Sequence, residues 1–235
     1  VGCKGCKSDC PTGVDLAKLK AEVKHEHHEE EGSGLRERIF RDIDRFSALG
    51  SKLAPISNAA TKVPGARRVM DAVAGIAPDR ELPTFRSESF EEWFASRGGS
   101  TVDPAEAVDT VTLFPDTYTN YSYPAAGKAA VEVLEAAGVR VEVPDGLAPS
   151  GRAAFSTGFL DEARERAATH VERLAPRARD GQSVVFVEPS DAVMFQDEYR
   201  DLLDGDAATA EPALVSPGTL GAVGTAIAVA LFVVA

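Results

Sequence analysis

The chain's three cysteines lie together near its first residue, in the segment CKGCKSDCP. Their spacing, Cys-x2-Cys-x3-Cys-Pro, is the second part of the run Cys-x2-Cys-x2-Cys-x3-Cys-Pro, whose thiolates hold iron–sulfur clusters. A disulfide framework is disfavoured, because it spreads an even number of cysteines along a chain. The spacing therefore predicts that Cys3, Cys6 and Cys10 are metal ligands, rather than free thiols in a surface loop, in a reducing compartment.

The ligand set of such a centre is incomplete in this sequence. The first cysteine of the longer run would fall immediately before Val1, so we expect the chain to be a fragment. In two-cluster proteins the last cysteine of the run ligates the other cluster. Cys3 and Cys6 would share one cluster with the preceding cysteine, and Cys10 would belong to a second. We therefore expect this polypeptide alone to bind no complete 4Fe–4S cluster.

Two further groups contain residue types that could bind a metal ion or act in nucleophilic catalysis. His25 and His28 have helical spacing that suits a metal ion, but they stand beside several glutamates in a run typical of a solvated helix face. Ser150 or Ser190 with His170 and Asp191 contains the residue types of a nucleophilic triad. No Gly-x-Ser-x-Gly elbow surrounds either serine, and we expect His170 to lie mid-helix among charges, so a triad is disfavoured. Arg152 is a weak candidate for binding an anion.

The composition excludes other function classes. The 235 residues are 44% hydrophobic and 26% charged, with a net charge of −12. A negative field of this size repels phosphate backbones and disfavours nucleic-acid binding. The acidic, lysine-poor surface resembles that of proteins from salt-rich cytoplasm. No signal peptide, Gly-x-Gly-x-x-Gly fingerprint or phosphate loop is present, so flavin or nicotinamide binding by this segment is unsupported.

The first half of the chain has helical patterns. Apolar residues repeat at helical spacing over 14–23 and 35–49, and shorter helices are expected over 54–58 and 69–73. Residues 78–104 are interrupted by proline and glycine and predict a connector with one short helix around Trp93. Phe90, Trp93 and Phe94 are expected to be core residues or a docking contact rather than a platform for a cofactor.

The second half alternates strands with helices. Strands are predicted over 110–114, 139–144 and 183–187, with helices over 125–137 and 159–174. This alternation predicts an α/β fold with a parallel sheet. Functional loops lie at the carboxyl ends of such strands, which here means 115–123, 144–155 and 188–195.

Several blocks of sequence, in order, resemble one family. They are residues 2–22, 35–40, 113–121, 127–134 and Glu188-Pro189-Ser190. Together they resemble the C-terminal iron–sulfur half of FAD-linked oxidases of the D-lactate dehydrogenase and glycolate oxidase type, over roughly residues 2–204. The resemblance implies an α-helical ferredoxin domain followed by a cysteine-rich CCG domain, which pass electrons from a flavin to an acceptor.

The chain departs from this family at the CCG cysteines. The double cysteine would fall at Pro149-Ser150, its partner at Asp191 and an earlier cysteine near Thr117. None of these positions offers the thiolate that an iron–sulfur cluster requires. The second half therefore resembles a cluster-binding scaffold that has lost its ligands and retains a docking or structural role.

These observations predict four segments and one principal function. The segments are the end of a helical ferredoxin-like domain (1–31), a helical connector (32–107), an α/β CCG-like domain (108–212) and an apolar tail (213–235). The function is electron transfer within an FAD-linked 2-hydroxy-acid dehydrogenase. The flavin would belong to an upstream part or a partner subunit, so the chain is not expected to be catalytic alone.

Two alternatives stay open at the level of sequence. One is a non-catalytic module that docks a partner subunit through a degenerate CCG domain, and a weaker one is a non-functional gene remnant. We expect a cytoplasmic protein. The tail over 213–235 is about as short as a membrane span can be and has no basic flank, so peripheral membrane association has only weak support.

Overall fold

The computed structural model describes residues 10–147 and 149–203. Within them, β1 (Asp109–Phe114), β2 (Val139–Glu142) and β3 (Ser183–Phe186) form one sheet. The strand order is β2-β1-β3 and both pairings are parallel. The predicted α/β fold, its parallel sheet and all three of its strands are confirmed.

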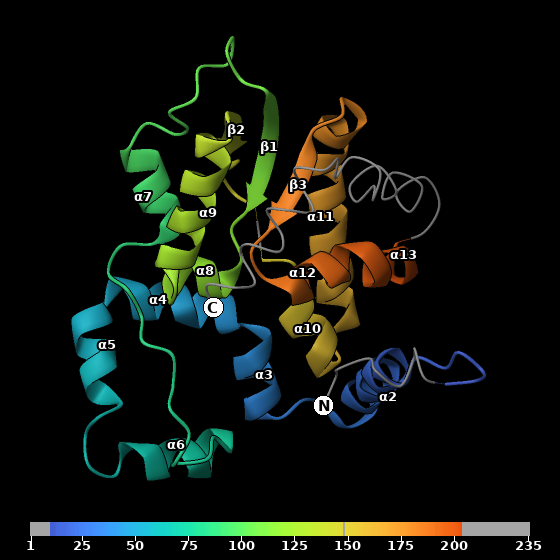
Figure 1. Ribbon diagram of the computed structural model, residues 1–235. Helices are drawn as coiled ribbons and strands as arrows, with labels where there is room; N and C mark the ends of the chain where they lie inside the picture. Colours follow the sequence, from blue (N-terminus) through green and yellow to red (C-terminus); the bar gives the residue numbers. More distant parts are fainter. Residues whose placement is uncertain (1–9, 148, 204–235) are drawn as a thin grey trace.

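Helices cover both faces of this sheet (Figure 1). On one face, α7 (Phe90–Ser96) and α9 (Pro124–Ala136) pack over β1 and β2. On the other lie α10 (Arg152–Thr157), α11 (Leu160–Arg179), the π-helical turn η1 (Met194–Glu198) and α13 (Tyr199–Leu202). The remaining short helices, α8 (Thr117–Tyr121) and α12 (Pro189–Val193), each follow a strand.

Each face has its own apolar core, because alternate strand residues point to opposite faces. Leu113 is 0% exposed and packs on the α9 side, whereas Phe114 is 1% exposed and packs on the α11 side. Phe90 and Phe94 are buried in the α9-side core, and Trp93 packs against it. The core role predicted for these aromatic residues is confirmed.

The long helix α11 extends five residues beyond the predicted end at 174. It contains Pro176, which has no backbone N–H to donate to a carbonyl oxygen of the preceding helical turn. Ala175 and Ala178 are both buried against the core, so tertiary packing holds the last turn in a helical conformation.

The amino-terminal half is a succession of helices. They are α2 (Leu16–Glu31), α3 (Leu35–Arg41), α4 (Ile43–Lys52), α5 (Ala54–Ala60) and α6 (Ala66–Ala74). The helix expected over 35–49 is therefore divided at Asp42. The Asp42 carboxylate binds the guanidinium of Arg41 at 2.7 Å, and Arg41 also reaches Glu162 of α11 at 3.1 Å. The break thus coincides with a tertiary ion-pair network.

No helix in the described part of the chain is both long and apolar enough to cross a bilayer. The apolar tail predicted over 213–235 lies outside the described residues, as do Cys3 and Cys6.

Candidate functional site

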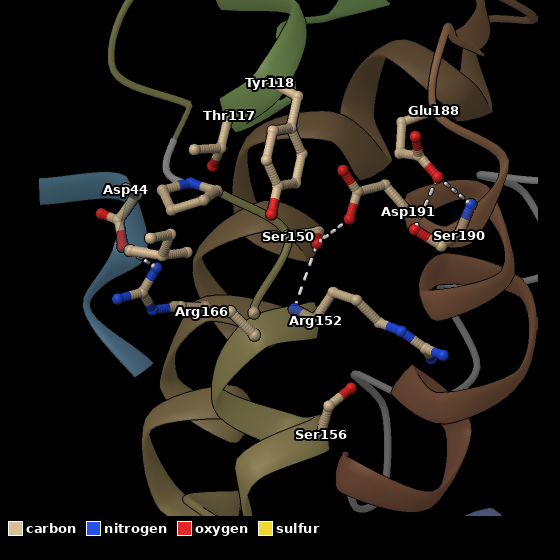
Figure 2. Close-up of a pocket in the computed structure, with 14 residues that line it drawn as sticks. Asp44, Thr117, Tyr118, Ser150, Arg152, Ser156, Arg166, Glu188, Ser190 and Asp191 are labelled. Atoms are coloured by element: carbon tan, nitrogen blue, oxygen red, sulfur yellow. Dashed lines mark hydrogen bonds and ion pairs between the residues drawn. The ribbon is translucent and has the colours of Figure 1, made fainter. Parts of the chain in front are cut away.

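A pocket of about 160 Å³ opens at the carboxyl ends of the strands (Figure 2). The loops after β1, β2 and β3 all contribute to it, as the parallel topology predicts. Its other wall comes from α4. The lining residues are Ile43, Asp44, Thr117, Tyr118, Pro149, Ser150, Gly151, Arg152, Ala153, Ser156, Arg166, Glu188, Ser190 and Asp191.

The pocket brings together the positions at which the family resemblance places the CCG cysteines. Thr117, Ser150 and Asp191 come from three different loops and all line this one pocket. They offer hydroxyl and carboxyl oxygens, whereas an iron–sulfur cluster requires thiolates. Among the described residues, this pocket therefore does not fit an iron–sulfur cluster.

Ser150 and Asp191 form the buried centre of the pocket. The Ser150 hydroxyl donates a hydrogen bond to Asp191 Oδ1, and both residues are buried. Burial raises the pKa of the Asp191 carboxyl to about 7, and the neighbouring carboxylates of Asp116 and Glu188 contribute to this increase. Asp191 can therefore gain or lose a proton near neutral pH.

The polar groups at the strand ends also begin the helices that follow them. Asp116 Oδ1 accepts from the amides of Tyr118 and Thr119 at 2.9 Å, which caps α8. Glu188 Oε1 accepts from the amide of Ser190 at 3.1 Å and caps α12. Within the described residues, Asp116 Oδ2 is buried without a hydrogen-bond partner, and burial raises the pKa of this carboxyl. The strand-end carboxylates thus have a structural role.

The two arginines of the pocket are engaged in ion pairs. Arg152 binds the fully buried Glu198 at 2.7 Å, and Arg166 lies 3.6 Å from Asp44. The suggestion that Arg152 holds an anion is weakened, because a carboxylate of the chain already occupies its guanidinium.

The residues of the suggested triad do not come together as one. His170 Nδ1 lies 2.6 Å from the hydroxyl of Tyr199, which donates to the Ser150 carbonyl at 2.7 Å. The Ser150 hydroxyl contacts Asp191, and the Ser190 hydroxyl donates to Glu188 at 2.8 Å. These pairings among the described residues are not those of a nucleophilic triad.

The expected surroundings of His170 are wrong. His170 is 0% exposed, with Phe114 and Phe195 packed around its ring, rather than among charges. Since the Tyr199 hydroxyl gives its single proton to the Ser150 carbonyl, Nδ1 of His170 is assigned as the donor to the Tyr199 oxygen. Tyr199 and His170 therefore fix the turn that carries Ser150.

Cys10 is the cysteine that the structure describes, and it is partly exposed. Its Sγ lies 3.1 Å from Thr12 Oγ1. This contact and hydrogen bonds from the amides of Val14 and Thr12 lower the pKa of the thiol to about 7. Such donors favour the thiolate, which is the form that ligates iron, so the surroundings of Cys10 fit the role of one cluster ligand.

Some features of the site were not anticipated from the sequence. They are the Arg152–Glu198 pair, the Arg166–Asp44 pair and the link from Tyr199 to Ser150. No local pattern marks these contacts, because their partners are distant in the sequence.

The chain is distantly homologous to parts of three kinds of curated protein. It is 29% identical to the C subunit of the anaerobic glycerol-3-phosphate dehydrogenase of Escherichia coli K12 over 173 residues. These residues cover 73% of the chain and 43% of that protein. It is 23% identical over 209 residues to D-2-hydroxyglutarate dehydrogenase of Haemophilus influenzae, covering 86% of the chain and 20% of that protein. No family model and no solved structure matches the chain.

The third kind of relative is shorter. Lactate utilization protein A of Shouchella clausii is 33% identical over 96 residues, which cover 41% of the chain and 38% of that protein. The chain thus spans less than half the length of each of these relatives. Two of the three are named as dehydrogenases or their subunits, and this supports the dehydrogenase-related part of the resemblance.

Proposed function

We propose that the chain is the iron–sulfur electron-transfer portion of an FAD-linked dehydrogenase that oxidises a hydroxyl-bearing substrate of the 2-hydroxy-acid type. Cys3, Cys6 and Cys10 would supply thiolate ligands to 4Fe–4S clusters, which would pass electrons from the flavin to an acceptor. The observation that carries the proposal is the Cys-x2-Cys-x3-Cys-Pro segment, joined to a region homologous to dehydrogenase subunits. The donors around the Cys10 thiol support it.

The substrate class rests on the names of the relatives. One is named for D-2-hydroxyglutarate and another for lactate, both of which are 2-hydroxy acids. The FAD and the substrate site would belong to an upstream part or to a partner subunit, and we propose the division into 1–31, 32–107, 108–212 and 213–235 as the organisation of this chain.

Anaerobic reconstitution with iron and sulfide tests the cluster. An excess of a small thiol should be present, because it can occupy coordination positions that this chain leaves open. We expect iron and sulfide uptake with an electron paramagnetic resonance signal on reduction, abolished by Cys3→Ser or Cys6→Ser. Cys10→Ser should leave the Cys3–Cys6 cluster in place, because Cys10 belongs to the other cluster.

A matched control is Ser8→Ala, which alters the same segment without removing a thiolate. Iron uptake that is the same in Cys3→Ser, Cys6→Ser and the parent chain would contradict the proposal.

A second candidate function, a docking module for a partner subunit, has its own supporting observation. Large apolar side chains are exposed along the helices before the sheet, and extensive exposed apolar surface is typical of interaction sites. The large apolar residues on α4, α5 and α6 that are at least 47% exposed are Phe46, Leu49, Ile56, Val69 and Val73. Oxygen ligands in place of thiolates in the strand-end pocket also favour this function.

The two functions differ in their response to mutation. If docking dominates, Leu49→Glu with Ile56→Glu should prevent co-purification with a co-expressed flavin-containing dehydrogenase subunit, while Cys3→Ser, Cys6→Ser and Cys10→Ser together should not. Lys52→Glu on the same helix is the control for added negative charge. Loss of electron transfer from the bound flavin in the triple cysteine variant would instead favour the relay.

A further inference from the structure

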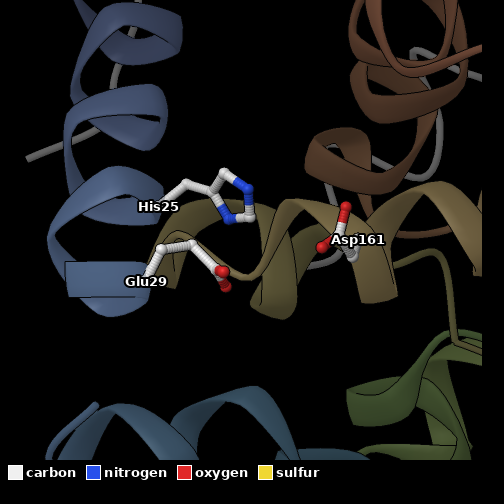
Figure 3. A group of neighbouring side chains, drawn as sticks. All are labelled: His25, Glu29 and Asp161. Atoms are coloured by element: carbon white, nitrogen blue, oxygen red, sulfur yellow. The ribbon is translucent and has the colours of Figure 1, made fainter. Parts of the chain in front are cut away.

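Three potential metal ligands from two helices meet where α2 contacts the beginning of α11. His25 and Glu29 are one helical turn apart on α2, and Asp161 is the second residue of α11. One ligand atom from each residue lies within 4.8 Å of the other two (Figure 3). We propose that His25, Glu29 and Asp161 bind a divalent first-row transition-metal ion, with zinc as the representative ion, and that this ion links α2 to α11.

The donor set suits such an ion. An imidazole nitrogen and two carboxylate oxygens are ordinary zinc ligands, and three protein ligands leave a position for water. Zinc bonds to these atoms are about 2.0–2.2 Å long, so in a tetrahedral site two ligand atoms lie about 3.3–3.6 Å apart. The three ligand atoms lie within 4.8 Å of one another, so side-chain rotation has to bring them closer by up to about 1.5 Å when the ion binds.

The site is preorganised by contacts that do not involve the metal. Gly158, at the corner between α10 and α11, has φ +87°, and its backbone touches α2. A Cβ atom there would lie 3.0 Å from the carbonyl carbon of Lys24 and 3.1 Å from the amide nitrogen of His25. Lys24 Nζ also donates to the Ser156 carbonyl at 2.8 Å. Binding therefore needs little ordering of the two elements, which favours affinity.

One group competes with the metal. Arg164 NH1 lies 2.6 Å from Asp161 Oδ1, with the two side chains 49% and 65% exposed. An ion pair this exposed contributes little to stability, so a metal ion can displace the guanidinium or bind the second carboxylate oxygen. Removal of the Arg164 guanidinium should therefore tighten metal binding. If Asp161 were not a metal ligand, removing its ion-pair partner would not increase the affinity for the metal.

Zinc titration of the whole 235-residue chain tests the site. The parent for this experiment carries Cys3→Ser, Cys6→Ser and Cys10→Ser, because cysteine thiolates would otherwise bind zinc themselves. Isothermal titration calorimetry should give one zinc ion per chain, and zinc should raise the melting temperature by mass action. His25→Ala, Glu29→Gln and Asp161→Asn should each weaken binding at least about tenfold, a lower bound taken from losses at outer-shell partners.

Two comparisons separate this site from general surface binding. His27→Ala is the matched control, because His27 is an exposed histidine of the same helix, and it should leave zinc affinity unchanged. Arg164→Gln should increase affinity. Cobalt(II) gives a second readout that reports ligand geometry directly: the parent should show visible d–d bands that His25→Ala loses.

Absence of stoichiometric zinc uptake by the folded parent would overturn the proposal. So would affinity that survives His25→Ala but falls in His27→Ala. Each variant is compared with the parent without metal by circular dichroism, so a folding defect is recognised independently. The iron–sulfur assignment is untouched by either result, because the cysteines are absent from this experiment.

Discussion

The sheet region and the helices that precede it bury different kinds of side chain. Around the sheet, the buried set includes large residues such as Phe114, Leu174 and Phe195. In α2 to α6 the buried residues are small, among them Ala21, Ala54 and Ser51. Burial of apolar area is the main favourable term in folding, so the sheet region has a core of its own, whereas the helical region leaves many of its large apolar side chains exposed.

The largest expected effect tests this difference in burial between the two regions directly. Leu113→Ala removes a fully buried side chain from the sheet and should lower the free energy of unfolding by about 3–5 kcal/mol through lost burial and a cavity. Ile56→Ala, at a residue 72% exposed on α5, should change it by less than about 0.5 kcal/mol. Urea unfolding followed by circular dichroism measures both. Equal losses would show that the two regions do not differ in this way.

A second contrast concerns charge instead of apolar area. Arg152→Ala should cost about 2–3 kcal/mol, because the buried Glu198 carboxylate loses its guanidinium in the sheet region. Arg45→Ala in the helical region removes an exposed partner 3.7 Å from Asp42 and should cost at most about 0.5 kcal/mol. The same urea titration applies, and a cost for Arg45→Ala as large as that for Arg152→Ala would contradict this contrast.

The smallest expected effect depends on pH. The folded-state pKa of Asp191 is about 7, raised from an ordinary value of 3.8, so between these values the folded state keeps a proton that the unfolded state has lost. Ionising this carboxyl therefore lowers stability as pH rises from about 4 to about 7. The amide introduced by Asp191→Asn cannot ionise but can still accept from Ser150. This variant should match the parent near pH 4 and be more stable than the parent by about 1–3 kcal/mol at pH 8, less than the roughly 4 kcal/mol equivalent to the full pKa shift, because the surroundings of the carboxylate relax when it ionises.

Asp79→Asn, at an exposed position in the helical region, is the control for this measurement. Removing this carboxylate, which lies outside the pocket, should not reproduce the gain in stability expected of Asp191→Asn at pH 8. A stability difference for Asp191→Asn that stays constant with pH would show that the carboxyl does not titrate near neutrality in the folded protein.

The proposed zinc site would join the two regions, because its ligands come from both of them. His25 and Glu29 belong to the helical region and Asp161 to the sheet region. If the ion binds as proposed, the two regions are coupled by a link that depends on neither apolar burial nor the cysteine clusters.

Local patterns predicted much of the sheet region and less of the helical region. The strands at 110–114 and 183–187 are short apolar runs bounded by turn residues, and such runs form strands wherever a sheet can receive them. The helix expected over 35–49 was divided instead, because a periodic pattern does not report the ion pairs of Asp42 and Arg41.

By itself, the sequence determined the parallel α/β architecture, the three loops that carry the site and the cysteine spacing, since each depends on neighbours within a few residues. Only the tertiary structure decided that Ser150 pairs with Asp191, 41 residues away, and that Arg152 pairs with Glu198, 46 residues away. It also decided the burial of His170 and the meeting of His25 with Asp161. The physical reason is that helix packing sets these contacts, and no spacing along the chain encodes which helix faces meet.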